Sequence, residues 1–270
     1  MDDVHPDVLV RPNHDAKVSV WAHAADIGEG VETQAHCHPD HGQLMHIYSG
    51  VMRVDTSSGS FVIPPERAVW VPAGVMHASA YPRAVKFRTL YLNTSFYEHL
   101  PQDCGVVQVT PLLRELIKVM MRRPQHYMRD SETGRLADVI ADQICALPAA
   151  TLSLQVSMAQ GHRGLEEFCQ QVREAPALAP SIDGAARGLA MSVRSFERHF
   201  KKATGQNYRV WCAQVKMLGA LELLASGLRV SEISHQLGYE GASGFIQQFK
   251  STFGTTPGQY YRNVLKGEKP

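Results

Sequence analysis

The feature that most constrains the fold of this chain is a pattern that occurs twice in its last ninety residues. Phe196 and Phe200 are four residues apart and so share one face of a predicted helix, and Phe245 and Phe249 repeat this spacing. Each pair is followed by a lysine and then by a glycine that can end a helix in the left-handed conformation. From Ser181 onward the period of the apolar residues is helical, so the sequence predicts an all-α C-terminal part with two similar halves.

Each half predicts two helices joined by a short turn. The apolar residues of the first helix recur in both halves, at Ile182, Ala185, Ala186 and Leu189 and again at Val230, Ile233 and Leu237. Ser192 can cap the second helix of the first half with its hydroxyl oxygen, and Gly238–Gly241 form the turn of the second half. A long helix over 210–224 separates the halves. Such a spacer would hold two helix-turn-helix units on one face, about 34 Å apart, which is one turn of DNA.

Charge separates this part from the rest of the chain. Residues 181–270 hold 12 Lys and Arg against 6 Asp and Glu, whereas residues 1–180 hold 15 against 20. A basic C-terminal part on an acidic N-terminal part indicates that the former meets a polyanion. The alternative is a plain helical bundle whose phenylalanine pairs are only core. The duplicated spacing, the capped second helices and the local basic excess agree with each other and favour a DNA-binding part.

Residues 181–262 resemble the DNA-binding domain of the AraC/XylS family of transcription regulators. The segments that carry the resemblance are SVRSFERHFKKATG at 192–205, Gly238-Tyr239, and the FKSTFGTTPG ending at 249–258 followed by Tyr260-Tyr261-Arg262. The resemblance implies that a small set of side chains meets DNA, namely Arg194, Glu197, Arg198 and Lys201 in the first unit and Ser243, Gly244, Gln247 and Lys250 in the second. Arginine suits the guanine acceptors, and glutamate can accept from cytosine N4.

The second unit departs from the family pattern. Gly241 and Ala242 stand where the family places a polar cap, and Gly244 lacks a side chain at a position expected to read bases. We therefore expect the first unit to carry most of the base specificity. The second unit would contribute mainly phosphate contacts, with Lys250 as a candidate.

The N-terminal part predicts strands and then helices. Alternating apolar residues, short apolar runs and Ser/Gly or Pro-rich turns between about residues 15 and 95 predict a small sandwich or barrel. Helical spacing follows after Pro111, again from Leu136 to Leu147, and over 164–173, with a connection over 148–162. We thus predict an α+β chain: a jelly-roll-like barrel over 1–100, linking or dimerisation helices over 101–180, and the all-α domain with two helix-turn-helix units over 181–270.

Histidines gather in the predicted barrel. His36 and His38 would point to one face of a strand, Gln43 follows five residues later, and His77 comes after the turn at 72–74. These segments resemble the two signature motifs of the cupin barrel, whose usual ligands are two histidines, a glutamate and a final histidine. Here Gln43 replaces the glutamate, and Glu66 stands where the second motif begins with glycine.

The resemblance makes His36, His38, Gln43 and His77 candidates for holding a divalent transition metal or a small effector. His41 and His46 are further candidates as ligands. A neutral amide is a weaker metal ligand than a carboxylate, so the departure at Gln43 leaves two other interpretations open. In these the histidines line an effector pocket without metal, or lie on the surface. Regulatory cupins of the AraC/XylS family often hold an effector without metal.

The five cysteines are scattered, and no run of about 18 apolar residues predicts a membrane span. The acidic start of the chain lacks the basic and apolar regions of a signal peptide, so we expect a cytoplasmic protein. The partners expected are double-stranded DNA of a promoter or operator and a small-molecule or metal effector. RNA polymerase and a second copy of the chain are candidates.

Three classes of function remain. The leading one is a sequence-specific transcription regulator, not an enzyme, whose DNA binding is controlled by an effector or metal ion in the cupin domain. The alternative is a cupin metalloenzyme fused to a DNA-binding domain, which the three histidines favour and Gln43 disfavours. A non-specific architectural DNA binder is the third, and the polar reading positions of the first unit disfavour it.

Overall fold

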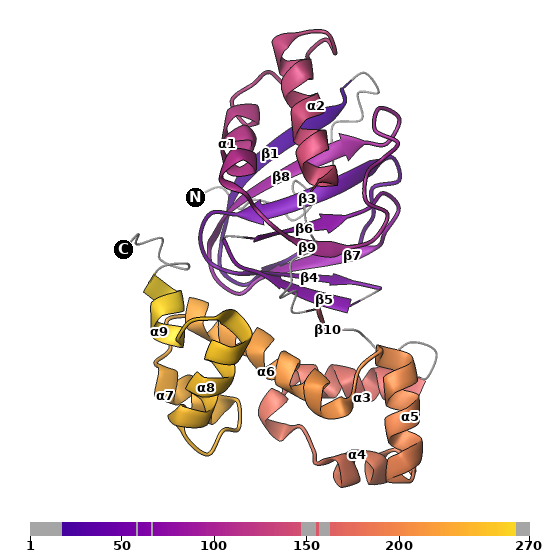
Figure 1. Cartoon of the computed structure of the whole chain (residues 1–270), viewed down its shortest axis with the longest axis vertical. Coiled ribbons are helices and arrows are strands. Elements are labelled where there is room, and N and C mark those ends of the chain that lie inside the picture. The colour runs from indigo at the N-terminus through magenta and orange to yellow at the C-terminus, as the bar shows by residue number, and fades with distance from the viewer. Residues whose placement is uncertain (1–17, 58, 66, 147–154, 157–162, 263–270) are drawn as a thin grey trace. The chain divides into compact units, whose positions relative to one another are not determined.

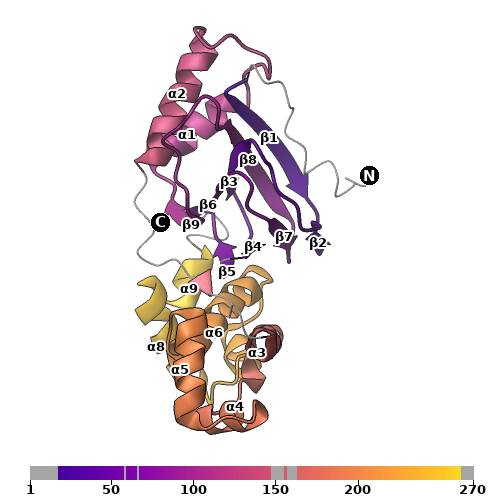
Figure 2. The same cartoon turned by 90° about the vertical axis from the view of Figure 1, so that its right-hand side faces the viewer.

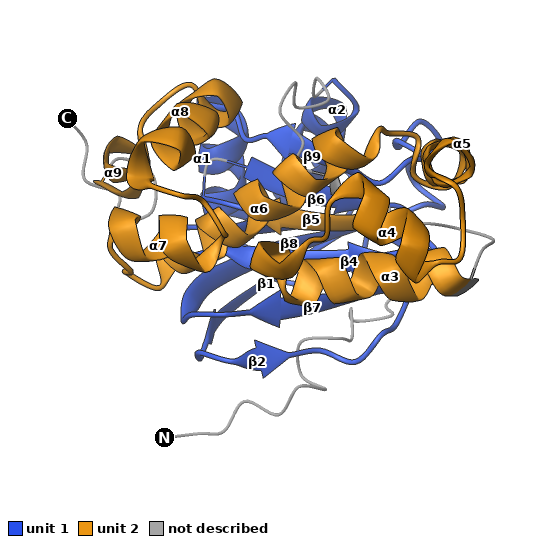
Figure 3. Cartoon of the chain, turned by 90° about the horizontal axis from the view of Figure 1, so that it is seen from below, with its two compact units in different colours: residues 1–57, 63–153, 264–268 blue, residues 58–62, 154–263, 269–270 orange. Residues whose placement is uncertain are grey.

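The computed structural model describes residues 18–57, 59–65, 67–146, 155–156 and 163–262. The start of the chain, Glu66 and most of the expected connection over 148–162 lie outside these ranges. The chain divides into two compact units, one of residues 1–57, 63–153 and 264–268 and the other of 58–62, 154–263 and 269–270 (Figure 3). The strands followed by helices in the first, and the helices of the second, agree with the predicted α+β class.

The strands form two antiparallel sheets (Figure 1). The first has the order β1-β8-β3-β6-β9 and the second the order β10-β5-β4-β7-β2. Their bounds are β1 Val20–Ile27, β2 Val31–Glu32, β3 His41–Ile47, β4 Met52–Thr56, β5 Gly59–Ile63, β6 Arg67–Val71, β7 His77–Tyr81, β8 Val85–Asn93, β9 Gly105–Gln108 and β10 Gln155–Val156.

Strand alternation gives the two faces of the first sheet different partners. Along β3, Gln43 and Met45 point to one side and Leu44 and His46 to the other. Met45 reaches across to the second sheet, where the Ser79 hydroxyl lies 3.7 Å from its sulfur. The two sheets therefore pack face to face, and Gln43 lies on the side between them.

Two helices cover the other face of the first sheet, as Figure 2 shows. Helix α1 is Pro111–Met120 and α2 is Glu132–Cys145. Their apolar stripes pack on Leu44, Trp70 and Leu90 of the sheet. Each helix begins at a residue whose hydroxyl accepts a backbone N–H, Thr110 for α1 and Ser131 for α2. Burial of these stripes fixes the first sheet and thus β3, which bears Gln43.

The segment predicted as linking helices, 101–180, is more varied than expected. It also contains β9, which pairs with β6 at the edge of the first sheet. Helices α1 and α2 fall in the first unit and α3 (Arg163–Glu174) in the second. The three-part division of the chain stays a prediction.

Apart from β10 and most of β5, the described residues of the second unit are mainly helical. After α3 and the short 3-10 helix η2 (Pro176–Leu178) come α4 Ile182–Gly188, α5 Val193–Thr204, α6 Tyr208–Ala225, α7 Val230–Gln236, α8 Ala242–Phe253 and α9 Pro257–Tyr260. Figure 1 places α5 and α8 near opposite ends of α6, the predicted spacer. No helix among the described residues is both long and apolar enough to cross a membrane.

Aromatic side chains hold each helix-turn-helix to the rest of this unit. Phe196 and Phe200 of α5 are fully buried, and the ring of Phe200 lies 5.5 Å from that of Trp211 in α6. Phe249 of α8 is also fully buried, and its ring lies 5.6 Å from that of Tyr260 in α9. The predicted role of the phenylalanine pairs as core is confirmed, so the opposite faces of α5 and α8 are free for other contacts.

Candidate DNA interface and histidine cluster

The outward face of α5 is a row of polar side chains. Arg194, Glu197, Arg198 and Lys201 are all exposed, and each lies on the side away from the buried Phe196 and Phe200. Within the part of the chain that the structure describes, no hydrogen bond or ion pair involves these four side chains. Long charged side chains without an internal partner can extend into a groove at no cost of a broken ion pair.

The ends of α5 fix this face. The Ser192 hydroxyl accepts from the backbone N–H of Ser195 at 3.2 Å, and Gly205 ends the helix at φ 73°. Both ends are those predicted from the sequence. A capped first turn holds Arg194 in a defined position, because the N–H groups next to it have partners.

Helix α8 repeats the length and the C-terminal end of α5, so the positions of the two helices can be matched one by one. Both helices have 12 residues and both end at a left-handed glycine, Gly254 in α8 at φ 75°. Counted from the helix start, Arg194 matches Ser243, Arg198 matches Gln247 and Lys201 matches Lys250. The predicted Ser243, Gln247 and Lys250 are exposed, as a DNA-facing row requires.

The same count corrects one expected match. Gly244 corresponds to Ser195, and Ile246 is the residue that stands where Glu197 stands in α5. Gly244 is exposed, as expected, but it does not occupy the place of Glu197. Ile246 is half-exposed and was missed by the sequence analysis. The repeated phenylalanine pairs carry the signal for this match, because Glu197 directly follows Phe196 and Ile246 directly follows Phe245.

The start of α8 lacks the cap that α5 has. Its N-cap is Gly241, and no side chain accepts a hydrogen bond there. The departure noted at Gly241 in the sequence is thus confirmed in the structure. The first turn of α8 therefore leaves backbone N–H groups that water or a phosphate can satisfy.

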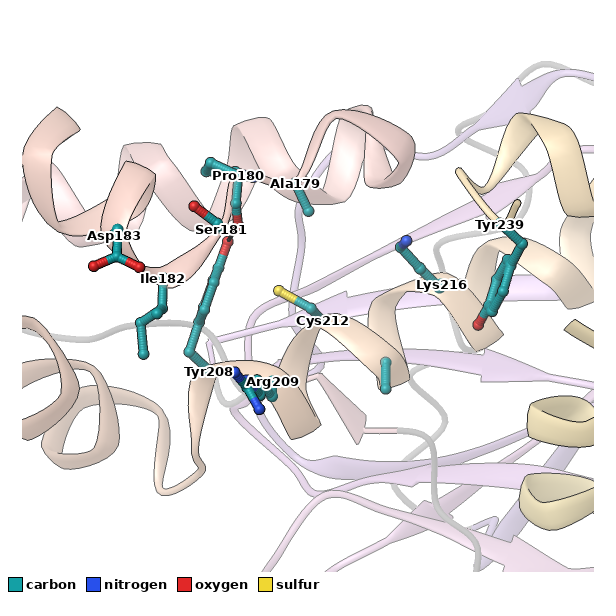
Figure 4. A pocket seen from close by; sticks show the side chains of 11 residues that line it. Ala179, Pro180, Ser181, Ile182, Asp183, Tyr208, Arg209, Cys212, Lys216 and Tyr239 are labelled. Carbon is teal, nitrogen blue, oxygen red and sulfur yellow. Dashed lines mark hydrogen bonds between the residues drawn. The ribbon is translucent and has the colours of Figure 1, made fainter. Parts of the chain in front are cut away.

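A cleft of about 420 Å³ lies elsewhere in this unit, along α6 (Figure 4). The Tyr208 hydroxyl crosses it to donate to the carbonyl oxygen of Pro180 at 2.8 Å. At its other end the Lys216 ammonium lies 5.1 Å from the centre of the Tyr239 ring. These contacts join the start of α4 and the turn before α8 to one face of α6.

Three histidines lie close together in the first of the two compact units. The nitrogen atoms of His36, His38 and His77 that could bind a metal all lie within 4.8 Å of one another. His38 and His77 are 4% and 2% exposed, so solvent cannot reach their rings freely. The structure therefore brings together three of the four predicted ligands, and no other such group occurs among the described residues.

The backbone fixes which ring nitrogen each histidine presents. His36 Nδ1 lies 2.7 Å from the carbonyl oxygen of Gln34, and His77 Nδ1 lies 2.9 Å from that of Val75. A carbonyl oxygen only accepts, so Nδ1 carries the proton in both rings and Nε2 keeps its lone pair. This is the arrangement found in metal-binding histidines, whose second nitrogen is held by an acceptor.

Burial keeps the rings of His38 and His77 neutral. It lowers the pKa of His38 to about 3, and the neighbouring His77, His36 and His41 act in the same direction. Burial is also the main cause that lowers the pKa of His77 to about 4. At neutral pH both rings are therefore unprotonated, as a metal ligand or a hydrogen-bond acceptor must be.

Gln43 faces the same space between the sheets. It is 2% exposed, and its Nε2 donates to Thr89 Oγ1 at 3.1 Å. Its Oε1 has no hydrogen-bond partner, and the same holds for Nε2 of His38 and of His77. Buried polar atoms normally have partners, so this group of unpaired atoms fits a ligand that supplies positive charge or donors. Three imidazole nitrogens and an amide oxygen suit a divalent transition metal.

Two details differ from the sequence-based expectations for the histidines. His36 and His38 do not share a regular strand; His36 instead forms an isolated backbone bridge with His77. His46, an additional candidate ligand, points to the opposite face of β3 and is bound through Nδ1 to the carbonyl oxygen of Arg67 at 3.0 Å. His41 lies close enough to His38 to lower its pKa, but it is not one of the three grouped histidines. Glu66 lies outside the described residues.

Both parts of the chain match known families. Residues 23–146 match the model of an AraC-like ligand binding domain, and residues 185–263 match a helix-turn-helix domain.

Similar proteins are named as transcription regulators. The HTH-type transcriptional regulator NimR of Escherichia coli is 29% identical over 248 residues, covering 92% of this chain and 88% of its own. The virulence regulon transcriptional activator VirF of Yersinia enterocolitica is 31% identical over 225 residues, covering 82% and 80%. Among solved structures, ToxT from Vibrio cholerae aligns with a TM-score of 0.37 at 11% identity, covering 91% of this chain and 99% of that one.

Proposed function

Because the chain belongs to the AraC family of transcription regulators, we propose that it recognises specific promoter or operator sequences mainly through α5, under the control of a ligand at the histidine cluster. The family consists of transcription regulators and not of enzymes. The observation that carries the proposal is the outward face of α5, where Arg194, Arg198 and Lys201 are exposed without a described internal partner. Arginines on a capped second helix are suited to guanine edges in the major groove.

The two helix-turn-helix units contribute unequally to the recognition of DNA. Arg194, Glu197 and Arg198 supply three side chains that can hydrogen-bond to base edges, so α5 reads the sequence. In α8 the uncapped start and Gly244 remove part of that capacity, and Lys250 supplies charge for a phosphate. This division supports base recognition by the first helix-turn-helix unit and phosphate binding by the second.

A pair of matched variants tests this division. Arg198 and Gln247 occupy the same position of α5 and α8. With a duplex selected from a random-sequence pool, Arg198→Ala should weaken specific binding by about 1–3 kcal/mol and relax the sequence preference at one base pair. Gln247→Ala should cost clearly less. Equal losses of affinity and of selectivity from the two variants would contradict the division.

At the histidine cluster, a divalent transition metal bound by Nε2 of His36, His38 and His77 is the ligand that the donor set supports best. Gln43 Oε1 or a water molecule would complete the coordination. When bound, the metal would supply a cross-link between the His36–His77 bridge and the rest of the space between the sheets. An uncharged organic effector that donates hydrogen bonds to the same nitrogens is the alternative occupant.

Metal analysis separates these occupants. The purified full chain is treated with a chelator, then supplied with Zn²⁺, Ni²⁺ or Co²⁺, and its thermal unfolding and its affinity for the selected duplex are measured. A cluster that binds metal should raise the unfolding temperature and change the affinity, and His77→Ala should abolish both responses. His235→Ala, a change of an exposed histidine on α7, should keep them. If chelation and metal addition change neither quantity, the metal is excluded and the organic effector remains.

We further propose that the chain acts on RNA polymerase at promoters and pairs with a second copy. Membership in the family supports the first. Exposed apolar side chains on the helices of the first unit, Leu112 and Val119 of α1 and Val139 of α2, support the second. Changing Leu112 and Val119 together to serine should lower the mass of the particle measured by sedimentation, and an unchanged mass would contradict a contact through these residues.

A further inference from the structure

The half-exposed side chain of Ile246 has no assigned role in DNA recognition. It lies on α8 between the buried Phe245 and the exposed Gln247. Phe245 and Phe249 fix the inner face of the helix, because both are fully buried. With that face fixed, Ile246 must lie at the border of the outward face, on the side of Lys250 and Ser243.

Counting residues along the two helices shows which residue of α5 corresponds to Ile246. Ile246 is the fifth residue of α8, and Glu197 is the fifth residue of α5. In the proposed function, which this inference rests on, Glu197 meets a base edge. The same place in the second unit therefore holds an apolar side chain where the first holds a hydrogen-bond acceptor.

An apolar side chain can read one base in the major groove. Only thymine presents a methyl group there, at C5. When this methyl group contacts the side chain of Ile246, apolar surface of both groups is removed from water, which favours binding. A hydrogen-bonding edge opposite Ile246 would instead lose its water without gaining a partner. The position thus favours thymine and disfavours the other three bases.

We propose that Ile246 is a specificity-determining residue that selects a thymine through its methyl group in the DNA segment contacted by α8. The second helix-turn-helix unit then recognises one base in addition to its phosphate contacts. Its specificity comes from apolar contact, whereas that of α5 comes from hydrogen bonds.

The test removes the methyl group from the DNA. Duplexes bound by the full-length protein are first selected from a random-sequence pool, and each thymine of the best duplex is then replaced in turn by deoxyuridine. For the unchanged protein, one replacement should weaken binding about fourfold, the ratio that burial of one methyl-sized group corresponds to. Ile246→Ala should bind the thymine duplex about fourfold more weakly and should not respond to that replacement.

Three controls separate recognition from folding and charge. Val210→Ala removes another exposed apolar side chain of the same unit, on α6, and should keep the full response to deoxyuridine. Ile246→Val should keep part of it. The dependence of affinity on salt should be the same for Ile246→Ala and the unchanged protein, because no phosphate contact is lost.

The outcomes separate this proposal from the function on which it rests. If no duplex is enriched over random DNA, sequence-specific binding itself fails. If a duplex is enriched but no thymine replacement weakens binding, or if Ile246→Ala responds to every replacement as the unchanged protein does, the assignment of Ile246 is overturned while the regulator function stands.

Discussion

The turns of the two helix-turn-helix units carry different residues at one matched position, Ala190 and Gly238. Exchanging these residues should change the stability of the two helix-turn-helix units in opposite directions. Ala190 and Gly238 each follow the C-cap of the first helix of their unit, and both have positive φ, 54° and 71°. The left-handed region costs a residue with a Cβ about 1–2 kcal/mol, whereas glycine enters it freely. Ala190 therefore carries strain that Gly238 avoids.

The structure sets the expected magnitudes. Ala190→Gly releases the strain, but the greater freedom of glycine in the unfolded chain costs about 0.5–1 kcal/mol, so the net gain is about 0.5–1 kcal/mol. Gly238→Ala adds the strain, and the new Cβ would lie 3.1 Å from the carbonyl oxygen and 3.2 Å from the Cα of Ala177. These are backbone atoms that cannot turn away, so the expected net loss is about 1–3 kcal/mol.

Hydrogen exchange of the full-length variants measures each unit separately. A change of 1.4 kcal/mol in local opening alters amide exchange about tenfold. Peptides from α4 and α5 should exchange about two- to fivefold more slowly in Ala190→Gly. Peptides from α7 and α8 should exchange at least fivefold faster in Gly238→Ala. Unchanged exchange in Gly238→Ala, or faster exchange in Ala190→Gly, would refute the argument from backbone strain.

Three further changes test other parts of the structure. Gly42→Ala would place a Cβ 2.3 Å from Cη2 of Trp70, whose buried indole is held by a hydrogen bond to a carbonyl oxygen, so urea unfolding should show a loss of about 1–3 kcal/mol. Lys250→Ala should weaken binding to specific and random duplexes alike and reduce the slope of log affinity against log salt by about one, measured by titration at several salt concentrations. Burial first, and nearby arginines as well, lower the pKa of His46 to about 4 from 6.5, so only the unfolded chain takes up this proton between those values. The free energy of unfolding should therefore fall as pH drops from 6.5 to 4, and His46→Gln should reduce that fall in urea titrations at pH 7 and pH 5.

The elements that the sequence predicted well are those with local causes. The start of α5 depends on the Ser192 hydroxyl and its end on the backbone freedom of Gly205, and both signals lie within the helix or next to it. The strands of the first unit were likewise visible from alternation of the kind seen in Met52–Thr56. Local signals survive folding because the residues that create them remain neighbours.

The histidine site was predicted in composition but not in local structure. The two motifs identified His36, His38 and His77, yet the first two were placed on a strand that the structure does not contain. What unites them is a backbone bridge between His36 and His77, a pairing between distant parts of the chain. Strand alternation alone would have removed His46, since it lies an odd number of residues from Gln43 on β3.

The missed position of Ile246 concerns a single match. Gly244 was given the place of Glu197, whereas Ser243, Gln247 and Lys250 were matched correctly to Arg194, Arg198 and Lys201. Glu197 directly follows Phe196 and Ile246 directly follows Phe245, so the phenylalanine pairs themselves give the correct match.

The two ends of α8 differ in a way that gives its outward residues different roles. At its C-terminal end, Phe249 packs on Tyr260 of α9, so the backbone under Lys250 is held firmly and can place a charge on a phosphate. At its N-terminal end, Gly241 provides no side-chain cap and Gly244 no packing, so Ser243 sits on a turn that opens more readily. Ile246 follows the buried Phe245 and shares its anchored backbone. Of the outward residues near the start of α8, it is thus the one whose side chain is held firmly enough to discriminate between bases, because a contact worth one methyl group cannot also offset the cost of ordering a loose turn.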